Sequence, residues 1–310
     1  MRILVTGASG FVGSLIVPRL LSEGHQVRAL ARDPDRARGR IQPGTELIRG
    51  DALTGEGLRQ ALEGVEVAYY LIHSMEPMEP AANPGFAQRD RIAARRFAAA
   101  AASAGVRRIV YLGGLRPVQA AESAHLASRG EVERILLDAV PDSVALRASL
   151  VIGARSRSFR ALVRLIERLP VVPLPPWRRY RTQPIDERDA IAYLIAAAAT
   201  PGVGGGAFDI GGPEVLSYGV MIERITALLL LARPTVRVPA GLGGIISALA
   251  ARVSGAPREL LGPLMGSLGG DLLADDAPAR AAFAVPLHGF DAAVEHALRD
   301  WEALEPLRGR

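Results

Sequence analysis

The 310-residue sequence contains no cysteine. It can therefore form no disulfide framework, zinc–thiolate site or iron–sulfur cluster, and it offers no cysteine nucleophile. Lysine is missing as well, so all 37 basic residues are arginine. Chemistry that needs a lysine amine, such as Schiff-base formation or phosphate binding by a P-loop lysine, is thereby excluded. The lack of cysteine fits a reducing compartment, and we expect a cytoplasmic protein.

Aromatic side chains and long apolar runs are also scarce. Aromatics make up 5% of the chain, and the arginines behind its net charge of +5 are dispersed. Nucleic-acid surfaces usually combine clustered cations with stacking aromatics, so we expect no nucleic-acid partner. The longest apolar stretches, 227–232 and 241–251, fall short of the ~20 residues of a membrane-spanning helix. The first residues lack the apolar core of a secretory signal. We expect no membrane span.

The first half of the sequence alternates short apolar segments with segments of helical period, which is typical of a parallel α/β sheet. The short segments are almost uniformly apolar, as in strands that are buried on both faces. We therefore predict a doubly wound parallel sheet. The predicted strands are 2–6, 26–31, 46–49, 65–72, 108–112 and 143–147, and the predicted helices are 11–23, 57–62, 86–104 and 128–139.

The regular alternation of strand-like and helical segments ends after about residue 153. A proline-rich run at 170–176 interrupts an otherwise helical pattern, and a short apolar segment at 207–210 resembles one further strand of the main sheet. At 310 residues the chain exceeds the size at which a single core usually stops growing. We expect the second half to form a smaller, mostly helical lobe. Its predicted helices are 156–169, 186–199, 218–232, 243–254 and 291–304.

A glycine motif follows the first predicted strand. Gly7, Gly10 and Gly13 are spaced Gly-x-x-Gly-x-x-Gly between a strand and a helix. Such glycines allow a tight turn, close backbone approach to a pyrophosphate and close helix–strand packing, and the helix N-terminus attracts the phosphates. The motif predicts a Rossmann domain that binds a dinucleotide. We assign residues 1–155 to this domain, with 182–212 returning to it, and 156–310 mainly to a substrate-binding lobe.

The end of the second strand selects between the two nicotinamide cofactors. An acidic residue there would bind the ribose 2′-hydroxyl of NAD, whereas this chain has Ala31 followed by Arg32 and Asp33. A guanidinium at position 32 can bind the 2′-phosphate of NADP, which favours NADP(H) over NAD(H). The alternative is that Arg32 is a solvated side chain and Asp33 a helix cap. Asp51 can accept from the adenine amino group, cap a nearby helix, or do both.

These motifs resemble the short-chain dehydrogenase/reductase superfamily, in its extended and atypical branches and most closely its NmrA-like and YbjT-like NAD(P)-binding proteins. The resemblance is carried by residues 6–13, 50–51, 68–75, 105–114, 146–153 and 183–185. It implies a Rossmann fold, a nicotinamide cofactor along the carboxyl ends of the strands, a variable C-terminal lobe and a possible homodimer through the helices 86–104 and 128–139. The cofactor contacts that we expect are Gly7, Ser9, Gly10, Phe11, Val12, Gly13, Arg32, Asp51, Ala52, Leu71, His73, Arg129, Ser149 and Val151.

The sequence departs from this family at the catalytic residues. Active members generally use Ser or Thr with a Tyr-x-x-x-Lys pair on the helix after the fifth strand, whereas this chain has His125 and Arg129 at that spacing. Residues four apart share one helix face. His125 can act as a general acid, because histidine titrates near neutral pH, while Arg129 holds the cofactor. His73, at the end of the fourth strand, is the second candidate acid. The alternative is that both histidines are structural.

Two functions remain open at this stage. The first is an NADP(H)-dependent oxidoreductase that reduces a small carbonyl, quinone or enone, with His125, Arg129 and His73 as catalytic residues and with Gln183 and Trp177 near the substrate. The second is a non-catalytic NAD(P)-binding protein with a regulatory, redox-sensing or assembly role, which the missing Tyr/Lys pair favours. The five histidines show no metal-ligand spacing, so we expect no metal.

Overall fold

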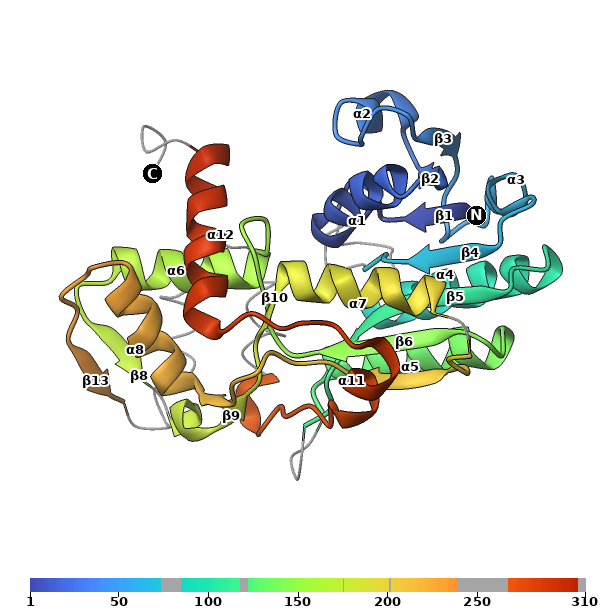
Figure 1. Ribbon diagram of the computed structural model, residues 1–310. Helices are drawn as coiled ribbons and strands as arrows, with labels where there is room; N and C mark the ends of the chain where they lie inside the picture. Colours follow the sequence, from blue (N-terminus) through green and yellow to red (C-terminus); the bar gives the residue numbers. More distant parts are fainter. Residues whose placement is uncertain (74–84, 118–121, 175, 201, 239–266, 306–310) are drawn as a thin grey trace.

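The computed structural model describes residues 1–73, 85–117, 122–174, 176–200, 202–238 and 267–305. The predicted helix 243–254 lies outside these residues. A large α/β unit holds the N-terminus, and a smaller lobe, whose described residues form three α-helices, lies beside it (Figure 1). No helix among the described residues is long and apolar enough to cross a membrane.

The main sheet has seven strands in the order β11-β6-β5-β4-β1-β2-β3, and all neighbouring pairs are parallel. The strand order reverses beside β1, which pairs with β2 on one side and β4 on the other. This confirms the predicted doubly wound sheet and puts the switch point, where such sheets bind ligands, at the carboxyl ends of β1 and β4. The strands are β1 (Arg2–Thr6), β2 (Gln26–Ala31), β3 (Glu46–Arg49), β4 (Val67–Tyr70), β5 (Arg108–Gly114), β6 (Val144–Ala148) and β11 (Gly206–Asp209).

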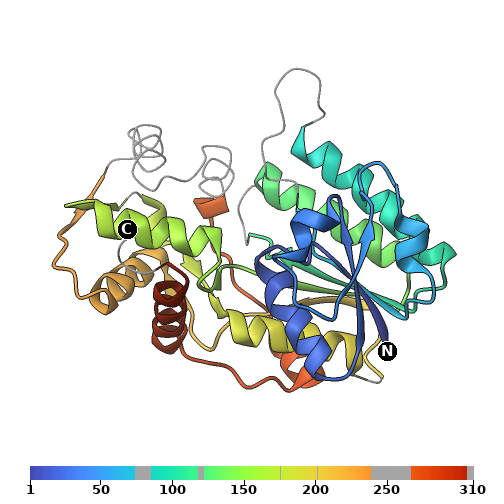
Figure 2. The ribbon, with the colours of Figure 1, turned by 90° about the horizontal axis from the view of Figure 1, so that it is seen from above.

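Helices cover both faces of the sheet (Figure 2). Side chains alternate between the faces of a strand, so Ile3 and Val5 belong to one buried cluster and Leu4 to the other. The first cluster lies under α1 (Phe11–Ser22), α2 (Pro34–Arg38), α7 (Glu187–Ala199) and α11 (Ala277–Phe283). The second lies under α3 (Leu58–Leu62), α4 (Phe86–Ser103) and α5 (Ala124–Ala139).

The structure corrects several predicted boundaries. Helix α5 begins at Ala124, as the assignment of His125 and Arg129 to one helix face requires, and so extends the range 128–139; the Ser123 side chain caps it by accepting from the Leu126 amide at 3.3 Å. Strand β4 ends at Tyr70 rather than at 72, because the next amide, of Leu71, donates to the Thr6 hydroxyl and not to a neighbouring strand. Helix α8 (Tyr218–Leu228) ends before the predicted 232, where Leu230 adopts a positive φ of 55°.

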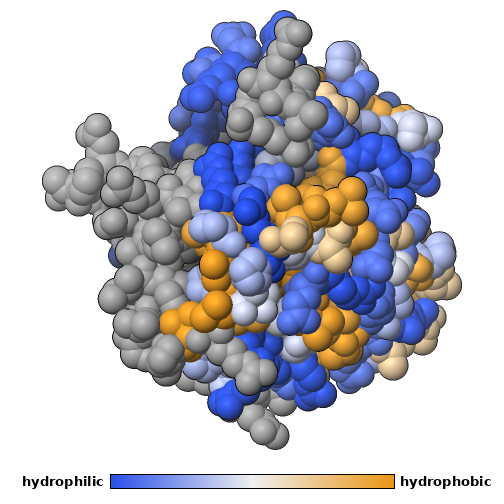
Figure 3. Space-filling view, turned by 90° about the vertical axis from the view of Figure 1, so that its left-hand side faces the viewer, coloured by the Kyte–Doolittle hydropathy of each residue, from blue (hydrophilic) through white to orange (hydrophobic). Residues whose placement is uncertain are grey.

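The smaller lobe has its own buried cluster, which includes Phe159, Met221 and Trp301. The exposed large apolar residues of the described chain all lie in its second half, and they are Val171, Val215, Val220, Leu230, Val236 and Leu304. Apolar patches are visible on the outer face of the lobe (Figure 3). Its elements, with the segments that connect it to the sheet, are β7 (Val151–Ile152), α6 (Arg157–Arg168), β8 (Val172–Leu174), η1 (Pro176–Arg179), β9 (Arg181–Thr182), β10 (Ile185–Asp186), β12 (Leu216–Ser217), α8, β13 (Thr235–Arg237), η3 (Ser267–Gly269) and α12 (Phe290–Leu304).

Segment 182–212 connects the lobe back to the sheet. It contains α7, which packs against α1, and β11, which pairs with β6 as the predicted last strand of the main sheet. The Arg147 guanidinium further ties β11 to the sheet, since it contacts Glu133 of α5 at 2.6 Å and Asp209 of β11 at 3.5 Å. We propose to keep the domain boundary near residue 155. The homodimer remains a prediction.

Candidate active site

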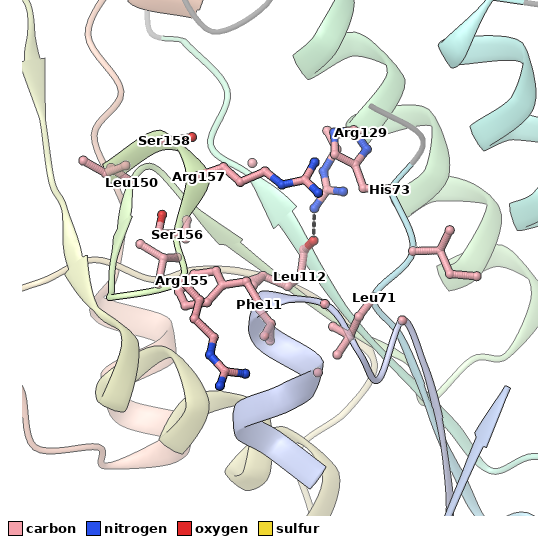
Figure 4. A pocket seen from close by; sticks show the side chains of 18 of the residues that line it. Phe11, Leu71, His73, Leu112, Arg129, Leu150, Arg155, Ser156, Arg157 and Ser158 are labelled. Atoms are coloured by element: carbon pink, nitrogen blue, oxygen red, sulfur yellow. Dashed lines mark hydrogen bonds between the residues drawn. The ribbon is translucent and has the colours of Figure 1, made fainter. Parts of the chain in front are cut away.

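One large cavity, of about 1380 Å³, runs along the carboxyl ends of the sheet and continues into the smaller lobe. Its walls come from the loop after β1, the ends of β2, β4, β5 and β6, the start of α5, and the lobe. All fourteen residues that the sequence predicted as cofactor contacts line this cavity. Figure 4 shows the part of it where His73, Arg129 and Arg157 approach one another. The structure therefore brings the predicted site residues together, although they are spread over 145 positions from Gly7 to Val151.

The loop between β1 and α1 has the close backbone packing that the glycine motif predicted. Gly7 has a φ of +70°, and a Cβ atom on it would lie 2.7 Å from the Leu71 carbonyl oxygen. A Cβ atom on Gly13 would lie 2.2 Å from the Gly7 carbonyl oxygen. The N-cap of α1 is Gly10, which supplies no capping side chain, so the first amides of the helix remain available to a ligand. These features fit a pyrophosphate at the loop.

The adenosine end of the cavity carries more cations than the sequence analysis identified. Arg32 lines the cavity, and so do Arg36 and Arg40. Asp33 caps α2 by accepting from the Arg36 amide at 3.1 Å, so this alternative for Asp33 is confirmed. The short helix thereby places Arg36 near Arg32. The sequence offered one indication of this placement, because Arg36 lies about one helical turn after Asp33, the predicted cap.

Asp51 follows β3 directly and lines the cavity. Its carboxylate accepts from the Leu53 amide at 2.7 Å, which closes a tight turn, whereas the helix α3 begins only at Leu58. Asp51 is therefore not the cap of that helix. One carboxylate oxygen is used in the turn, and the contact with adenine stays a prediction.

At the other end of the cofactor region two histidines lie side by side. The ring centroids of His73 and His125 are 5.0 Å apart. His73 Nδ1 lies 3.3 Å from the carboxylate of Asp90, a buried residue of α4. Arg129, one turn after His125, donates to the Leu112 carbonyl oxygen, and its guanidinium lies 5.0 Å from the centroid of the Tyr111 ring. The predicted pair on one helix face is thus joined by His73, which lies in the segment that follows β4.

Burial and positive charge change how these histidines titrate. Burial, followed by the neighbouring His73 and Arg129, lowers the pKa of His125 to about 4, against the opposing effect of Asp90. Burial also lowers the pKa of His73, against the opposing effect of Asp90. The expectation that His125 titrates near neutral pH is therefore wrong, because its environment disfavours the imidazolium. At pH 7 both rings are neutral.

Two buried nitrogen atoms of this pair have no hydrogen-bond partner among the described residues. They are His73 Nε2 and His125 Nδ1. A buried polar atom normally has a partner, and both rings line the cavity. Together with the glycine loop, these atoms indicate that the cavity accommodates a polar ligand next to the imidazoles. The residues present fit a nicotinamide dinucleotide whose reactive end lies at this cluster.

Several site residues were not identified from the sequence. Asp90 orients His73, and Arg89, Arg155 and Arg157 line the cavity. Asp90 lies on the buried side of α4, where an acidic residue is rare unless it has a partner. Its position on the inner face of the predicted helix 86–104 was the only signal in the sequence. Arg155 and Arg157 follow β7 and belong to the lobe, so their distance from the cluster depends on tertiary packing.

Of the remaining candidate residues, three line the cavity and one does not. Trp177 lines the cavity and packs edge-on against Tyr218, with ring centroids 5.9 Å apart. Ser149 and Val151 line it as well. Gln183 does not: its buried amide donates to Gly212 O at 2.8 Å and accepts from the Ala274 amide at 3.2 Å. The expectation that Gln183 reaches the cleft is wrong, because its side chain binds backbone groups of two other segments and the Asp276 carboxylate instead.

Acidic and histidine side chains also gather near the N-terminus of α7, away from the cavity. The groups are Asp186, Asp189 and His288, and Glu187, His296 and Asp300. Their members are about 100 positions apart, so sequence spacing could not reveal them. Asp189 already binds the His288 ring at 2.5 Å, and Asp186 binds Arg188 at 2.5 Å. We assign no metal to either group.

The lowered pKa of His125 predicts a dependence of stability on pH. The pKa of His125 is about 4 in the folded protein, below its usual value of 6.5. The neutral ring therefore contributes fully to the free energy of unfolding above pH 6.5, and this contribution is lost as the pH falls toward 4. We expect the free energy of unfolding to fall by about 2 kcal/mol more between pH 7 and pH 5 in the wild type than in His125→Asn. Urea unfolding at the two pH values measures this. His25→Asn, outside the cavity, should retain the wild-type loss, and equal losses in all three proteins would contradict a buried neutral His125.

The fold and this cavity define an NAD(P)-binding protein with a Rossmann domain. Sequence comparison supports this assignment, since residues 7–146 match the family described as NAD(P)H-binding. The ceramide reductase of Caulobacter vibrioides is 30% identical over 65% of this chain and 62% of its own length. The (4-alkanoyl-5-oxo-2,5-dihydrofuran-3-yl)methyl phosphate reductase of Streptomyces griseus subsp. griseus is 29% identical over 73% of each protein. The chain thus matches less than two thirds of the first relative's length.

Solved structures with low sequence identity share the whole fold. The UDP-glucuronic acid 4-epimerase of Bacillus cereus, in complex with UDP-glucuronic acid and NAD, has a TM-score of 0.73 at 17% identity and covers 98% of this chain and 100% of its own. A short-chain dehydrogenase/reductase superfamily protein of Agrobacterium tumefaciens with bound NAD has a TM-score of 0.70 at 20% identity, with all of both chains covered. The chain therefore carries a domain of the NAD(P)H-binding family at residues 7–146, and it shares the fold of these solved structures.

Proposed function

We propose that this protein is an NADP(H)-dependent reductase of a small carbonyl, quinone or enone. The observation that carries the proposal is the cluster of His73, His125 and Arg129 at the end of the cavity that also contains the glycine loop. Two of the relatives are named as reductases, which supports the same class of reaction. Bound NADPH would supply a hydride to the substrate.

The chain's own residues would stabilise the charge that develops on the substrate oxygen. A neutral His125 has one ring N–H, which can donate a hydrogen bond to that oxygen, and the guanidinium of Arg129 places a permanent positive charge beside it. Neither residue needs to titrate in this scheme, so the lysine-free sequence is compatible with it. Water entering the cleft supplies the proton that completes the product.

Asp90 fixes the orientation of His73, and His73 in turn packs against His125. Asp90 acts through the imidazole and not on the substrate, so we assign it a positioning role. The exposed guanidiniums of Arg32, Arg36 and Arg40 support the preference for NADP, because the adenosine end of the cavity is rich in positive charge.

Titration of the purified protein with NADPH and NADH by calorimetry tests the cofactor preference. We expect Arg32→Ala to weaken NADPH binding about tenfold and to leave NADH binding unchanged, since a charge-assisted phosphate contact contributes about 1.5–3 kcal/mol. Arg38→Ala is the matched control, because Arg38 is exposed at the end of α2, the short helix that follows Arg32, and does not line the cavity. Equal losses for both nucleotides in Arg32→Ala would rule out a 2′-phosphate contact.

A second function is favoured by the neutral histidines and by the missing Tyr/Lys pair. The protein would then bind NAD(P) without turnover and act as a regulatory, redox-sensing or assembly protein. Tight NADPH binding with no oxidation of the bound cofactor by a panel of aldehydes, ketones, quinones and enones would support this alternative. Oxidation of NADPH by any one class above the buffer rate would support the reductase.

A further inference from the structure

The cavity extends beyond the cofactor region into the space between two helices of the lobe. On α6 its lining residues are Ser158, Ala161, Leu162, Leu165 and Ile166. This spacing places them on one face of the helix. The opposite wall is formed by α8, and β8 contributes further apolar lining. The result is an elongated groove between the two helices.

The groove is apolar and its inner end is buried. Ile166 is 0% exposed, and Met221 and Ile222 on the α8 wall are each 3% exposed. Val172 of β8, also buried, completes this end. The lining positions on α6 change from a serine at the mouth to leucine and isoleucine at the far end. Such walls favour an apolar ligand, and the unbranched Met221 side chain adapts to its shape.

The mouth of the groove has the opposite character. Arg157, at the start of α6, extends from the lobe toward Arg129 and His73 (Figure 4). The described lining residues of the lobe include Arg155 and Arg157 but no carboxylate. Oxygen atoms with partial or full negative charge are therefore favoured at the mouth, next to the neutral His125.

The length of the groove limits the ligand. From Ser158 to Leu165, the last lining residue of α6 that is partly exposed, the helix rises by about 10 Å at ~1.5 Å per residue. An extended, staggered carbon chain with bonds of about 1.5 Å covers this distance with about nine carbon atoms. The long wall of the groove is one face of α6, so an extended chain that lies along this helix contacts lining residues over its whole length.

We propose that the substrate carries an unbranched alkyl or acyl chain of about nine carbon atoms, which lies between α6 and α8, and that its oxygen-bearing end lies at Arg157 and Arg129. This inference rests on the proposed function only for the reduction itself. The chain-binding groove is a property of the lobe and can be measured without turnover.

Calorimetry of the NADP⁺-loaded protein with n-alkanoic acids of increasing length tests the groove. Burial of one methylene group contributes about 0.8 kcal/mol, so we expect affinity to rise roughly fourfold per carbon and to level off near nine or ten carbons. An affinity that does not depend on chain length, or that keeps rising well beyond this length, would overturn the inference.

Two variants locate the chain on opposite walls. Met221→Trp fills the groove from α8, and Ala161→Leu fills it more mildly from α6, where Ala161 is 6% exposed. We expect both to flatten the chain-length series and to reduce binding of decanoate at least tenfold. Val220→Trp is the matched control, because Val220 is the neighbouring residue on α8, is 42% exposed and does not line the cavity.

Affinity for NADP⁺ shows that each variant is folded, and Ala161→Leu replaces Met221→Trp if the larger substitution disturbs folding. A chain-length series that is equally flattened in Val220→Trp would overturn the groove assignment. Reduction of medium-chain aldehydes or ketones by NADPH is assayed separately. Failure of all reduction with an intact chain-length series contradicts the proposed function and not the groove, whereas reduction with no chain-length preference contradicts the groove and not the function.

Discussion

Gly13→Ala should lower the affinity for NADPH about 100-fold. The added Cβ atom would lie 2.2 Å from the Gly7 carbonyl oxygen and 2.6 Å from Ala8 Cα, and both are backbone atoms that cannot rotate away. The loop must shift to relieve the contact, and strain of about 3 kcal/mol corresponds to a factor of about 100 in binding. Calorimetric titration measures the affinity, and the thermal midpoint shows how much of the strain is relieved by partial unfolding.

Gly204→Ala is the matched control for this substitution. Gly204 is exposed, and a Cβ atom on it would meet no atom within 4 Å. We expect it to bind NADPH as the wild type does and to be equally or slightly more stable, because alanine restricts the unfolded chain. If Gly13→Ala retained wild-type affinity, the loop would not be the phosphate-binding element.

Arg129→Met should reduce kcat/KM by about 100-fold to 1000-fold, measured on the carbonyl of the panel that the wild type reduces fastest. The guanidinium is the permanent positive charge beside the two neutral histidines, and removal of one preorganised donor at a developing oxyanion typically costs a factor of this size. The substitution also removes the contact with the Leu112 carbonyl oxygen and the stacking on Tyr111. We therefore expect a slightly lower thermal midpoint as well.

Arg134→Met is the control on the same helix. The Arg134 side chain is 63% exposed and pairs with Asp138 of the next turn, an exposed ion pair of the kind that contributes little. Its kcat/KM should remain within about twofold of the wild type, since the effect of an exposed i,i+4 pair is about 0.5 kcal/mol at most. Similar losses in both variants would show that Arg129 acts through the stability of α5 and not at the site.

The class of sheet and the glycine loop after its first strand were accessible from the sequence because they depend on local patterns. The uniformly apolar strand β1, the glycines at 7, 10 and 13, and the helix that follows them are contiguous, so their spacing already defines the turn. The pair of His125 and Arg129 was identified for the same reason, since residues four apart on a helix share a face.

The contacts that decide the chemistry at the site are not local. Asp90 contacts the His73 ring although the two residues are 17 positions apart in the sequence. The Gln183 side-chain amide is hydrogen-bonded to backbone groups of two distant segments. Neither of these contacts can be predicted from the spacing of the residues in the sequence. It also suggests an ordinary pKa for a histidine at a helix start, whereas burial between Arg129 and a second imidazole lowers the pKa of His125 to about 4.

The sequence by itself determined the class of fold, the dinucleotide-binding loop and the absence of lysine-dependent or cysteine-dependent catalysis, because composition and contiguous spacing are sufficient for each. Only the tertiary structure decided the protonation state of the histidines, the placement of Arg157 opposite Arg129 and the apolar groove between α6 and α8. These depend on how far side chains are removed from water and on which helices meet, and both follow from packing of elements that are far apart in the chain.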